Sequence, residues 1–435
     1  MDFTEAFKQS QNATKFSPDS CYIATPVGNR LVVRDVDTMR IVTQREFPWS
    51  IQELLWSPDG EYLMVANLTA CQIRVWSVVD LDWTAAIDET TPAGLLAVVK
   101  WAPDGRSIIT IPDFALRLTI WSLLTKKVTY IQNPKYTDKG ISFRADGKYL
   151  AIIERRDSKD YICIYSTTDW KQAKQISIDT LDCMGFEWSP DGQFIVVWEN
   201  ITEYKALIYS LDGRRVSNYS AYKEGLGIKC VSWSPDSKLL ALGSYDQNVR
   251  ILDNFKWSPI NELFHTTNIN IPGTVIYHER EKHEDVKILR NRNGYTISEL
   301  PFTVISTRPD PEKPNPKLGV SFCEFNADGT LLASRNDNMP NTLWIWDPSD
   351  PRPLLLMHHR QPIKIVRWDP VHPGRIALCC GNGSLYLWTG VGFEPEEIEI
   401  PLVNFSIHNF RWSPDGRSLL LMDKETFCVA YFVNE

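Results

Sequence analysis

The segment KCVSWSPDSKLLALGSYDQNVRILD, residues 229–253, contains the pattern that decides the fold. An apolar run ends in Trp233, the turn Ser234-Pro235-Asp236 follows, and two further apolar runs come after it. The aromatic residue of this phrase recurs at positions 16, 56, 101, 143, 188, 233, 325, 368 and 412. Neighbouring positions are 40 to 45 residues apart, except for one gap of 92 residues after Trp233. A repeat of this length is typical of one four-stranded structural unit.

Each repeat has the pattern of four short strands. Ser-Pro-Asp-Gly is typical of a tight turn, and the runs around it are rich in Val, Ile and Tyr. The third run ends in an aromatic residue or Asp, as in QIRVWSV (72–78) and TLWIWDP (342–348), and a more polar fourth run follows. The 3.6-residue apolar spacing of a long helix does not occur. The sequence therefore predicts an all-β protein that folds as a β-propeller.

The repeats resemble those of WD-repeat β-propellers, and the resemblance covers nearly the whole chain. Trp346-Asp347 is the one Trp-Asp dipeptide that closes a third strand, and the Gly-His pair usual in that family is missing. We therefore expect the buried His–Asp–Ser–Trp network of typical repeats to be mostly absent. Apolar burial should then supply most of the stability of each blade.

Nine repeats predict nine blades. The ninth has three strands before the chain reaches Glu435, and residues 3–10 are long enough to supply the missing outer strand. Pairing of the two ends would close a single ring over residues 1–435 and remove an open sheet edge. Residues 266–317 are charged, end Pro-rich and contain two strand-like runs but no Pro-Asp-Gly phrase. We interpret them as a partly ordered insertion between blades six and seven.

The composition excludes several classes of function. The net charge of −8 and the pI near 5.5 do not fit the basic surface that dominates nucleic-acid binding. The N-terminal residues lack the apolar core of a signal peptide, and no apolar run reaches the length of a membrane helix. Nine scattered Cys without a CxxC motif are typical of a reducing compartment. We expect a cytoplasmic protein that binds neither nucleic acid nor membrane.

No motif predicts catalysis. The two His of HEREKH (278–283) are five residues apart, so on a helix they would not share one metal as the His of HExxH do. P-loop, dinucleotide-binding and G-x-S-x-G patterns do not occur, and most Asp residues lie in Pro-Asp-Gly turns. We therefore expect no enzyme activity, no catalytic or metal-binding residue and no cofactor.

Tryptophans recur at one position, where the outer strand begins in the second, fourth and sixth repeats: Trp83, Trp170 and Trp257. Two interpretations remain open. Each ring covers the outer edge of its own blade, or the three are half-exposed anchors on one face, of the type enriched at binding hot spots. Trp49, in the loop of residues 47–50, is a further candidate on the opposite face.

Two turns between second and third strands are longer and more charged than the matching turns elsewhere. They span residues 154–160 and 335–338, and their candidate partner-binding residues are Arg155, Arg156, Asp157, Lys159, Arg335, Asn336, Asp337 and Asn338. Turns of mixed charge are commonly plain solvated loops, but Arg also suits recognition of a partner's carboxylates. As surface residues they are expected to contribute little to stability.

A narrower resemblance rests on particular segments: RLVVRDVDT (30–38), LAIIERRDSKDYICIYSTTDW (150–170), EYKALIYSLDGR (203–214), YSAYKEGLGIKCVSWSPDSKLLALGSYDQNVRIL (219–252) and SRNDNMPNTLWIWD (334–347). They look like the WD repeat-containing protein 8 family of centrosome and spindle-pole-body proteins, and the likeness extends from the first strand to the last. ERRDSKDY and SRNDNMPN are not required by blade geometry, so they make the resemblance specific. The short chain suggests a fungal member.

The resemblance implies a non-catalytic adaptor that anchors microtubule minus ends at the spindle pole body or centrosome. Its implied partners are a coiled-coil spindle-anchoring protein and a minus-end-directed kinesin-14. Because the chain lacks a basic patch for the acidic microtubule surface, contact with microtubules is expected to be indirect. A second hypothesis is an RNA- and ribosome-binding nine-bladed propeller of the translation-initiation type, whose basic surfaces or helical extensions this acidic chain lacks.

Overall fold

The computed structural model describes residues 1–89, 95–280, 294–310, 312 and 317–433. In these residues it has 41 strands and no helix, which confirms the prediction of an all-β protein. The chain divides into two compact units. The first contains residues 1–188, 210–214 and 411–435, and the second contains residues 189–209 and 215–410.

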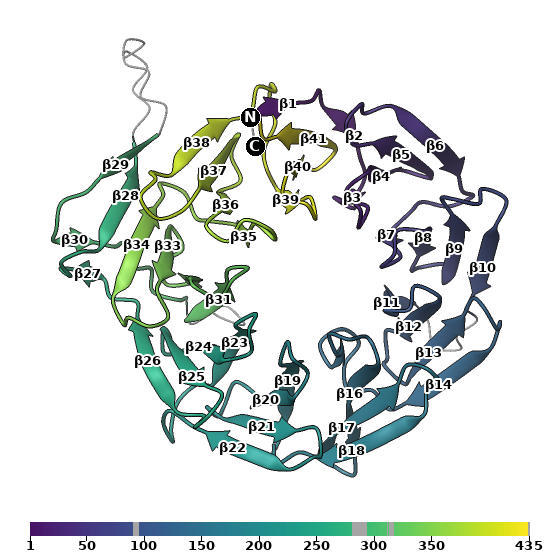
Figure 1. Cartoon of the computed structure of the whole chain (residues 1–435), viewed down its shortest axis with the longest axis horizontal. Helices are drawn as coiled ribbons and strands as arrows, with labels where there is room; N and C mark the ends of the chain where they lie inside the picture. Colours follow the sequence, from purple (N-terminus) through teal and green to yellow (C-terminus); the bar gives the residue numbers. More distant parts are fainter. Residues whose placement is uncertain (90–94, 281–293, 311, 313–316, 434–435) are drawn as a thin grey trace. The chain divides into compact units, whose positions relative to one another are not determined.

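Four blade sheets of the first unit are meanders, in which four consecutive strands lie side by side (Figure 1). They are β3 (Lys15–Phe16), β4 (Tyr22–Val27), β5 (Arg30–Asp35) and β6 (Ile41–Glu46); β7 (Glu53–Trp56), β8 (Tyr62–Asn67), β9 (Gln72–Ser77) and β10 (Thr84–Asp88); β11 (Leu96–Trp101), β12 (Ser107–Pro112), β13 (Arg117–Ser122) and β14 (Val128–Gln132); and β15 (Ile141–Phe143), β16 (Tyr149–Arg156), β17 (Lys159–Ser166) and β18 (Gln172–Ser177).

Four further sheets follow the same order. They are β19 (Cys183–Trp188), β20 (Phe194–Glu199), β21 (Ala206–Ser210) and β22 (Arg215–Tyr219); β23 (Ile228–Trp233), β24 (Leu239–Ser244), β25 (Asn248–Asp253) and β26 (Pro259–Phe264); β31 (Val320–Phe325), β32 (Leu332–Asn336), β33 (Thr342–Trp346) and β34 (Pro353–His358); and β35 (Ile365–Trp368), β36 (Ile376–Cys379), β37 (Ser384–Trp388) and β38 (Glu396–Glu399).

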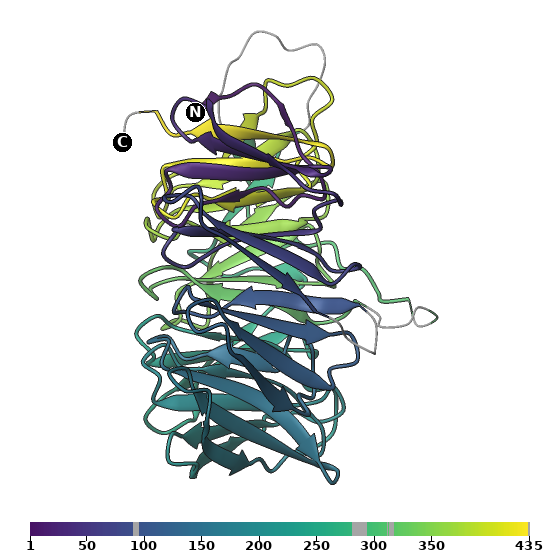
Figure 2. The ribbon, with the colours of Figure 1, turned by 90° about the vertical axis from the view of Figure 1, so that its right-hand side faces the viewer.

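The last sheet combines the two ends of the chain. Strands β39 (Asn409–Trp412), β40 (Ser418–Met422) and β41 (Thr426–Tyr431) come from the C-terminal residues, and β1 (Asp2–Phe3) and β2 (Phe7–Lys8) both pair antiparallel with β41. Figure 2 shows the purple N-terminal strands beside the yellow C-terminal ones. The N-terminal residues thus supply the outer strand of the sheet that the chain's last residues leave incomplete.

The Ser-Pro-Asp-Gly phrases form the turns between first and second strands. In the second sheet, Ser57 Oγ donates to Asp59 Oδ1 at 2.5 Å and accepts from Tyr62 N at 2.8 Å. Gly60 has a φ of 75°, which a residue without a side chain adopts without strain. The same Ser–Asp hydrogen bond recurs at Ser189, Ser234 and Ser413, so one local motif sets the start of most hairpins.

The core lies between the facing surfaces of neighbouring sheets. One cluster combines Met64, Ile73 and Val75 of the second sheet with Val99 and Ile108 of the third. In the second unit, the parallel rings of Trp344 and Trp346 stack with centroids 5.5 Å apart, and both are fully buried. The third-strand aromatic residues seen in the sequence therefore fill the space between blades, where large rings bury the most apolar area.

One buried polar network of the kind found in typical repeats is nevertheless present in the second unit. His265 Nε2 lies 2.8 Å from Ser334 Oγ, which also accepts a hydrogen bond from Trp346 Nε1 at 2.7 Å. His265 Nδ1 lies 2.7 Å from the Gln247 carbonyl oxygen. Burial lowers the pKa of His265 to about 4, so this imidazole is neutral at physiological pH. In the first unit Glu89 occupies a similar position, with Thr110 linking it to Trp121.

The segment 266–317 adds strands to the seventh sheet (Figure 1). Strand β28 (Val275–Glu279) pairs in parallel with β34 and antiparallel with β29 (Tyr295–Ile297), while β27 (Asn268–Ile269) and β30 (Phe302–Thr303) form a separate pair. Its apolar residues belong to the core, since Ile276 and Tyr295 are almost fully buried. His283 of the HEREKH motif lies outside the described residues.

Glu279, the last residue of β28, holds this strand against the eighth sheet. Its carboxylate accepts hydrogen bonds from Tyr386 Oη at 2.6 Å and Arg360 N at 2.8 Å, and it lies 3.7 Å from His359 Nδ1. Burial alone would raise the pKa of Glu279, but the nearby His359 ring and the hydrogen bonds from Arg360 N and Tyr386 Oη outweigh it and lower the pKa to about 2. The carboxylate is therefore ionised, and each of its two oxygens accepts a hydrogen bond from a group within the fold.

Candidate partner-binding surfaces

The charged segment 154–160 is a long hairpin with a short tip. Strands β16 and β17 are eight residues each and stay paired up to Arg156 and Lys159. Asp157 and Ser158 form the turn with φ values of 49° and 63°, the positive values of the tightest hairpin turns. The prediction of a seven-residue turn is therefore wrong, because the strands continue almost to the tip. Residues 155–159 are exposed.

An ion-pair network fixes the base of this hairpin. Lys135 Nζ lies 2.8 Å from Asp160 Oδ2 and 2.7 Å from Asp182 Oδ1, and Arg155 Nη1 lies 2.6 Å from the same Asp182 oxygen. Burial alone would lower the pKa of Lys135, but its hydrogen bonds to Asp160 and Asp182 outweigh burial and raise it. Arg155 thus has a partner within the fold, but both side chains of this pair are more than a third exposed, so the expectation that Arg155 contributes little to stability stays a prediction.

The remaining tip residues are the accessible ones. Arg156 pairs with the buried Glu154, which also accepts a hydrogen bond from Tyr165 Oη at 2.6 Å. The Arg156 side chain remains 42% exposed despite this contact. Asp157 and Lys159 are exposed at the tip itself. The hairpin therefore presents charges of both signs from a rigid support.

Two residues of the segment 335–338 are buried in the fold, so the prediction that they bind a partner is wrong for Asn336 and Asn338, while Arg335 and Asp337 are partly exposed. Asn336 and Asn338 are buried: Asn336 Nδ2 donates to Gln247 Oε1 at 3.0 Å, and Asn338 Nδ2 donates to the Thr307 carbonyl oxygen at 3.1 Å. Asp337 Oδ2 lies 2.7 Å from Lys229 Nζ. The Asn338 amide also accepts a hydrogen bond from Gly319 N, so it fixes the chain just before β31. Removing a side chain that satisfies buried backbone groups is costly, because those groups then lack a partner.

Arg335 is half-buried and structural as well. Its Nη1 donates to the carbonyl oxygens of Ile363 at 2.9 Å and Lys364 at 3.1 Å, and its Nη2 donates to Ser321 Oγ at 3.3 Å. These contacts join the seventh sheet to the chain that enters the eighth. These contacts argue against the expectation that replacing Arg335 would cost little stability, which stays a prediction for a thermal melt.

The three tryptophans before outer strands differ in exposure. Trp257 is 5% exposed and packs edge-on against Trp233 and Phe194, so the prediction of a half-exposed anchor is wrong for it. Trp170 is half-buried in the cluster between the third and fourth sheets. Trp83 is half-buried too, with its ring edge-on to Tyr62 at a centroid distance of 4.7 Å. The three positions are equivalent in sequence, but neighbouring blades cover them to different extents.

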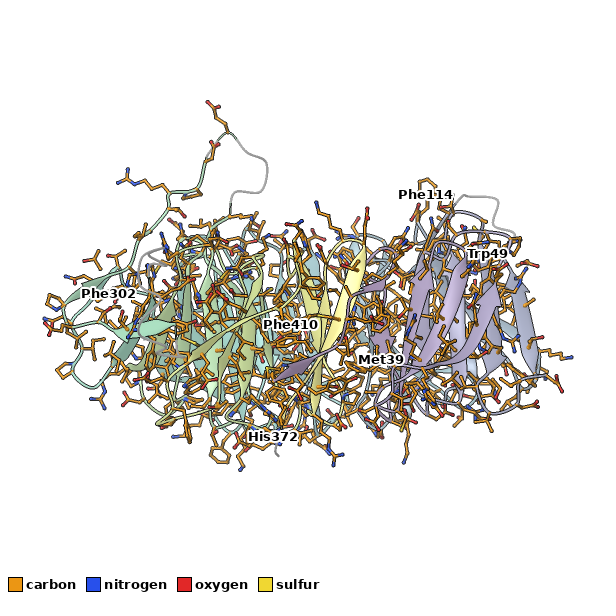
Figure 3. The ribbon with its side chains drawn as sticks, turned by 90° about the horizontal axis from the view of Figure 1, so that it is seen from above. Met39, Trp49, Phe114, Phe302, His372 and Phe410 are labelled. Carbon is orange, nitrogen blue, oxygen red and sulfur yellow. The ribbon has the colours of Figure 1, made fainter. Side chains whose placement is uncertain are left out.

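Trp49 lies on the face of the first unit opposite to the turns that precede outer strands. Figure 3 shows Trp49 and Phe114 at one face and Met39, in such a turn, at the other. Trp49 is half-buried and stacks on Phe47 with centroids 5.3 Å apart. Phe114, in the turn between β12 and β13, is 70% exposed.

A cleft of about 630 Å³ opens beside Trp83 at the rim of the first unit. One wall is strand β10, and the other consists of Trp121 to Leu123 with Lys126 to Val128. Trp83 was singled out by its position in the sequence, but the cleft itself and its lysines were missed. The pair Lys126-Lys127 was a visible signal, although only the packing of two sheets shows that it faces a tryptophan.

The described residues contain no group of three or more His, Cys, Asp or Glu side chains that could hold a metal ion. No helix long and apolar enough to cross a membrane occurs among them either. The geometry that the structure does show consists of rigid blades, charged tips and a rim cleft. These are features of surfaces that bind other proteins.

Comparison with known proteins relates the whole chain to WD-repeat proteins. Residues 186–271 match the WD40 domain of anaphase-promoting complex subunit 4. The chain is 39% identical to WD repeat-containing protein WRAP73 of Mus musculus over 447 residues, which cover 99% of this chain and 96% of that protein. It is 25% identical to the uncharacterized WD repeat-containing protein C32H8.09 of Schizosaccharomyces pombe, with 100% and 93% covered.

A solved structure supports the same fold. The C-terminal WD40 domain of Sif2 aligns with a TM-score of 0.51 at 13% identity, and the alignment covers 92% of this chain and 99% of that one. At this identity the likeness concerns the fold alone. Together with the nine blade sheets, it confirms the predicted WD-repeat β-propeller.

Proposed function

The chain belongs to the WD-repeat protein family that includes WRAP73, and from this premise we propose that it is a non-catalytic adaptor at the spindle pole. A WD-repeat propeller is suited to protein–protein scaffolding, because many turns on rigid sheets can hold several partners at once. We further propose that it is a fungal member of the WD repeat-containing protein 8 family, located at the spindle pole body or centrosome in the cytoplasmic cytoskeleton.

The observation that carries this proposal is the hairpin tip of residues 155–159. Its sequence is among the segments that resemble the spindle-pole family, and a two-residue turn does not require its charges. Arg156, Asp157 and Lys159 are exposed on a hairpin whose base is held by the buried Lys135–Asp160 ion pair. A charged, pre-organised tip binds without a large loss of side-chain and backbone freedom.

The proposed partners are a coiled-coil spindle-anchoring protein and a minus-end-directed kinesin-14. By holding both, the propeller would tether microtubule minus ends to the pole, with microtubules contacted through the kinesin. The net charge of −8 supports this indirect arrangement, because an acidic protein is repelled by the acidic microtubule surface.

The test reverses the charges at the tip and leaves the base of the hairpin intact. Asp157→Lys with Lys159→Glu should weaken pull-down of purified coiled-coil or kinesin-14 fragments and detach minus ends from the pole in cells. Lys424→Glu, an exposed change in the corresponding turn of the last sheet, is the matched control and should leave both unchanged. If wild-type protein binds neither fragment and instead crosslinks strongly to RNA, the translation-type function replaces this proposal.

A further inference from the structure

We propose that the rim cleft beside Trp83 is a binding groove for an extended, acidic segment of a partner protein, which adds to the sheet alongside β10. This inference rests on the adaptor function in general, since it requires a protein partner, but not on the identity of the two partners named above. It concerns only the first unit of the chain.

The first argument is the open edge of strand β10. Within the described residues β10 pairs only with β9, so its second edge is available to a further strand (Figure 1). Ala85 and Ala86 lie at its centre, and side chains this small let another backbone approach closely. A second cleft of about 330 Å³ lies on the other side of Thr84–Ala86, so the strand projects between two hollows.

The second argument is that this edge lacks the usual protection. Exposed edge strands normally carry Lys, Arg, Pro or several charges, which discourage pairing with other chains. The outer strands β6, β18, β22, β26 and β38 each contain at least one such feature, and β34 is covered by β28. β14 has no charged residue, and the one charge of β10, Asp88, is paired with Arg74 at 2.8 Å. Of the outer strands compared, β10 and β14 are thus the least protected, and the cleft is lined by β10 and by Val128 at the start of β14.

The third argument is the chemistry of the cleft. Trp83 lines the cleft, and Leu81, Leu124 and Tyr130, which lie within two residues of lining residues along the chain, are more than half exposed. Such a concentration of exposed apolar side chains around a hollow is typical of a peptide-binding surface. A partner segment with large apolar residues at alternate positions would place them on one side, toward Trp83.

The fourth argument is charge. Lys126 and Lys127 line the cleft and are exposed, and among the described residues neither has a carboxylate within ion-pair distance. They give this cleft two positive charges on a protein whose net charge is −8. They favour Asp or Glu in the bound segment, and they would bias the partner's orientation along β10.

The experiment uses the purified whole chain and a display library of random decapeptides. The expected selected sequences are rich in Asp and Glu and have apolar residues at alternate positions. Bound peptides should slow amide hydrogen exchange in residues 84–88, which is the sign of strand addition. Selection of basic or neutral peptides, or protection of another region alone, would overturn the proposal.

Two variants and a matched control locate the binding. Ala86→Lys places a charge on the open edge, and Lys126→Glu with Lys127→Glu reverses the charge of the cleft. Each should weaken peptide binding at least tenfold in fluorescence polarisation, with an unchanged thermal melt. Gln175→Lys is the matched control. Gln175 is an exposed residue of the outer strand β18 and precedes the buried Ile176, just as Ala86 is an exposed residue of β10 and precedes the buried Ile87. Equal affinity of all variants would refute the groove.

The outcome is separable from that of the spindle-pole proposal. If the Ala86→Lys protein loses peptide binding but still localises to the pole, the groove is real and serves another partner. If the wild-type protein binds acidic peptides but never localises to the pole, the groove is supported and the proposed function fails.

Discussion

Gln9 is the residue through which the N-terminal segment is most firmly attached to the last sheet. Its side chain is 5% exposed, and Nε2 donates to the carbonyl oxygens of Asp423 at 2.8 Å and Thr426 at 3.0 Å. Its Oε1 accepts from the hydroxyl of Thr14 at 2.7 Å. In Gln9→Ala these three hydrogen bonds disappear, and the buried Thr14 hydroxyl loses its acceptor.

Each lost hydrogen bond costs about 1 kcal/mol net, and a buried polar group without a partner costs about 1–3 kcal/mol. The two hydrogen bonds of Nε2 and the unsatisfied Thr14 hydroxyl together predict that Gln9→Ala lowers the free energy of unfolding by about 3–5 kcal/mol. Urea titration followed by tryptophan fluorescence measures this change, and limited proteolysis should show faster cleavage within the first ten residues. Gln44→Ala, an exposed change on β6, is the control with an expected loss under about 0.5 kcal/mol. A Gln9→Ala protein as stable as this control would refute the attachment.

Two further predictions concern the second unit. The pKa of Glu279 is lowered to about 2, so its carboxylate contributes stability above its ordinary pKa of 4.5, and this contribution is lost as the pH falls toward 2. Glu279→Gln should therefore flatten the dependence of unfolding free energy on pH between 4.5 and 2; an unchanged slope in urea titrations would contradict this. The Sγ atoms of Cys230 and Cys323 lie 3.2 Å apart, so diamide should oxidise the two thiols to a disulfide with release of two protons to the reduced diamide. Peptide mapping should detect this link in wild type and not in Cys230→Ser, and its absence in wild type would show that the thiols do not reach bonding geometry.

Local sequence determines most of the fold. A Ser-Pro-Asp-Gly turn satisfies its own hydrogen bonds within six residues, as Ser57 and Asp59 do, so its position in the sequence predicts a hairpin. The network of His265 and Ser334 was missed because the two residues are 69 positions apart, with the inserted strands between them. The parallel pairing of β28 with β34 has the same cause, since no local pattern indicates which strand a distant segment will join.

The candidate site was less predictable, because exposure depends on neighbouring blades. Trp83 and Trp257 have the same place in their repeats, yet only Trp257 is enclosed by Trp233 and Phe194. Asn338 looked like a residue of a solvated turn, but it is buried and its Oδ1 accepts a hydrogen bond from Gly319 N in the segment that leads into β31. Sequence identifies residues that could bind a partner, whereas burial decides which of them are accessible.

The pairing of β1 with β41 has a consequence for biosynthesis. Residues 2 and 3 precede their partners, residues 431 and 430, by 429 and 427 positions, so the ribosome makes the two halves of this pair at well-separated times. At about 5–20 residues per second, roughly 20–85 s separate the two events. Throughout that time Phe3 and Phe7 have no strand to join. The nascent N-terminus is therefore a segment that molecular chaperones could shield, and the final sheet can form only after residue 431 has been made.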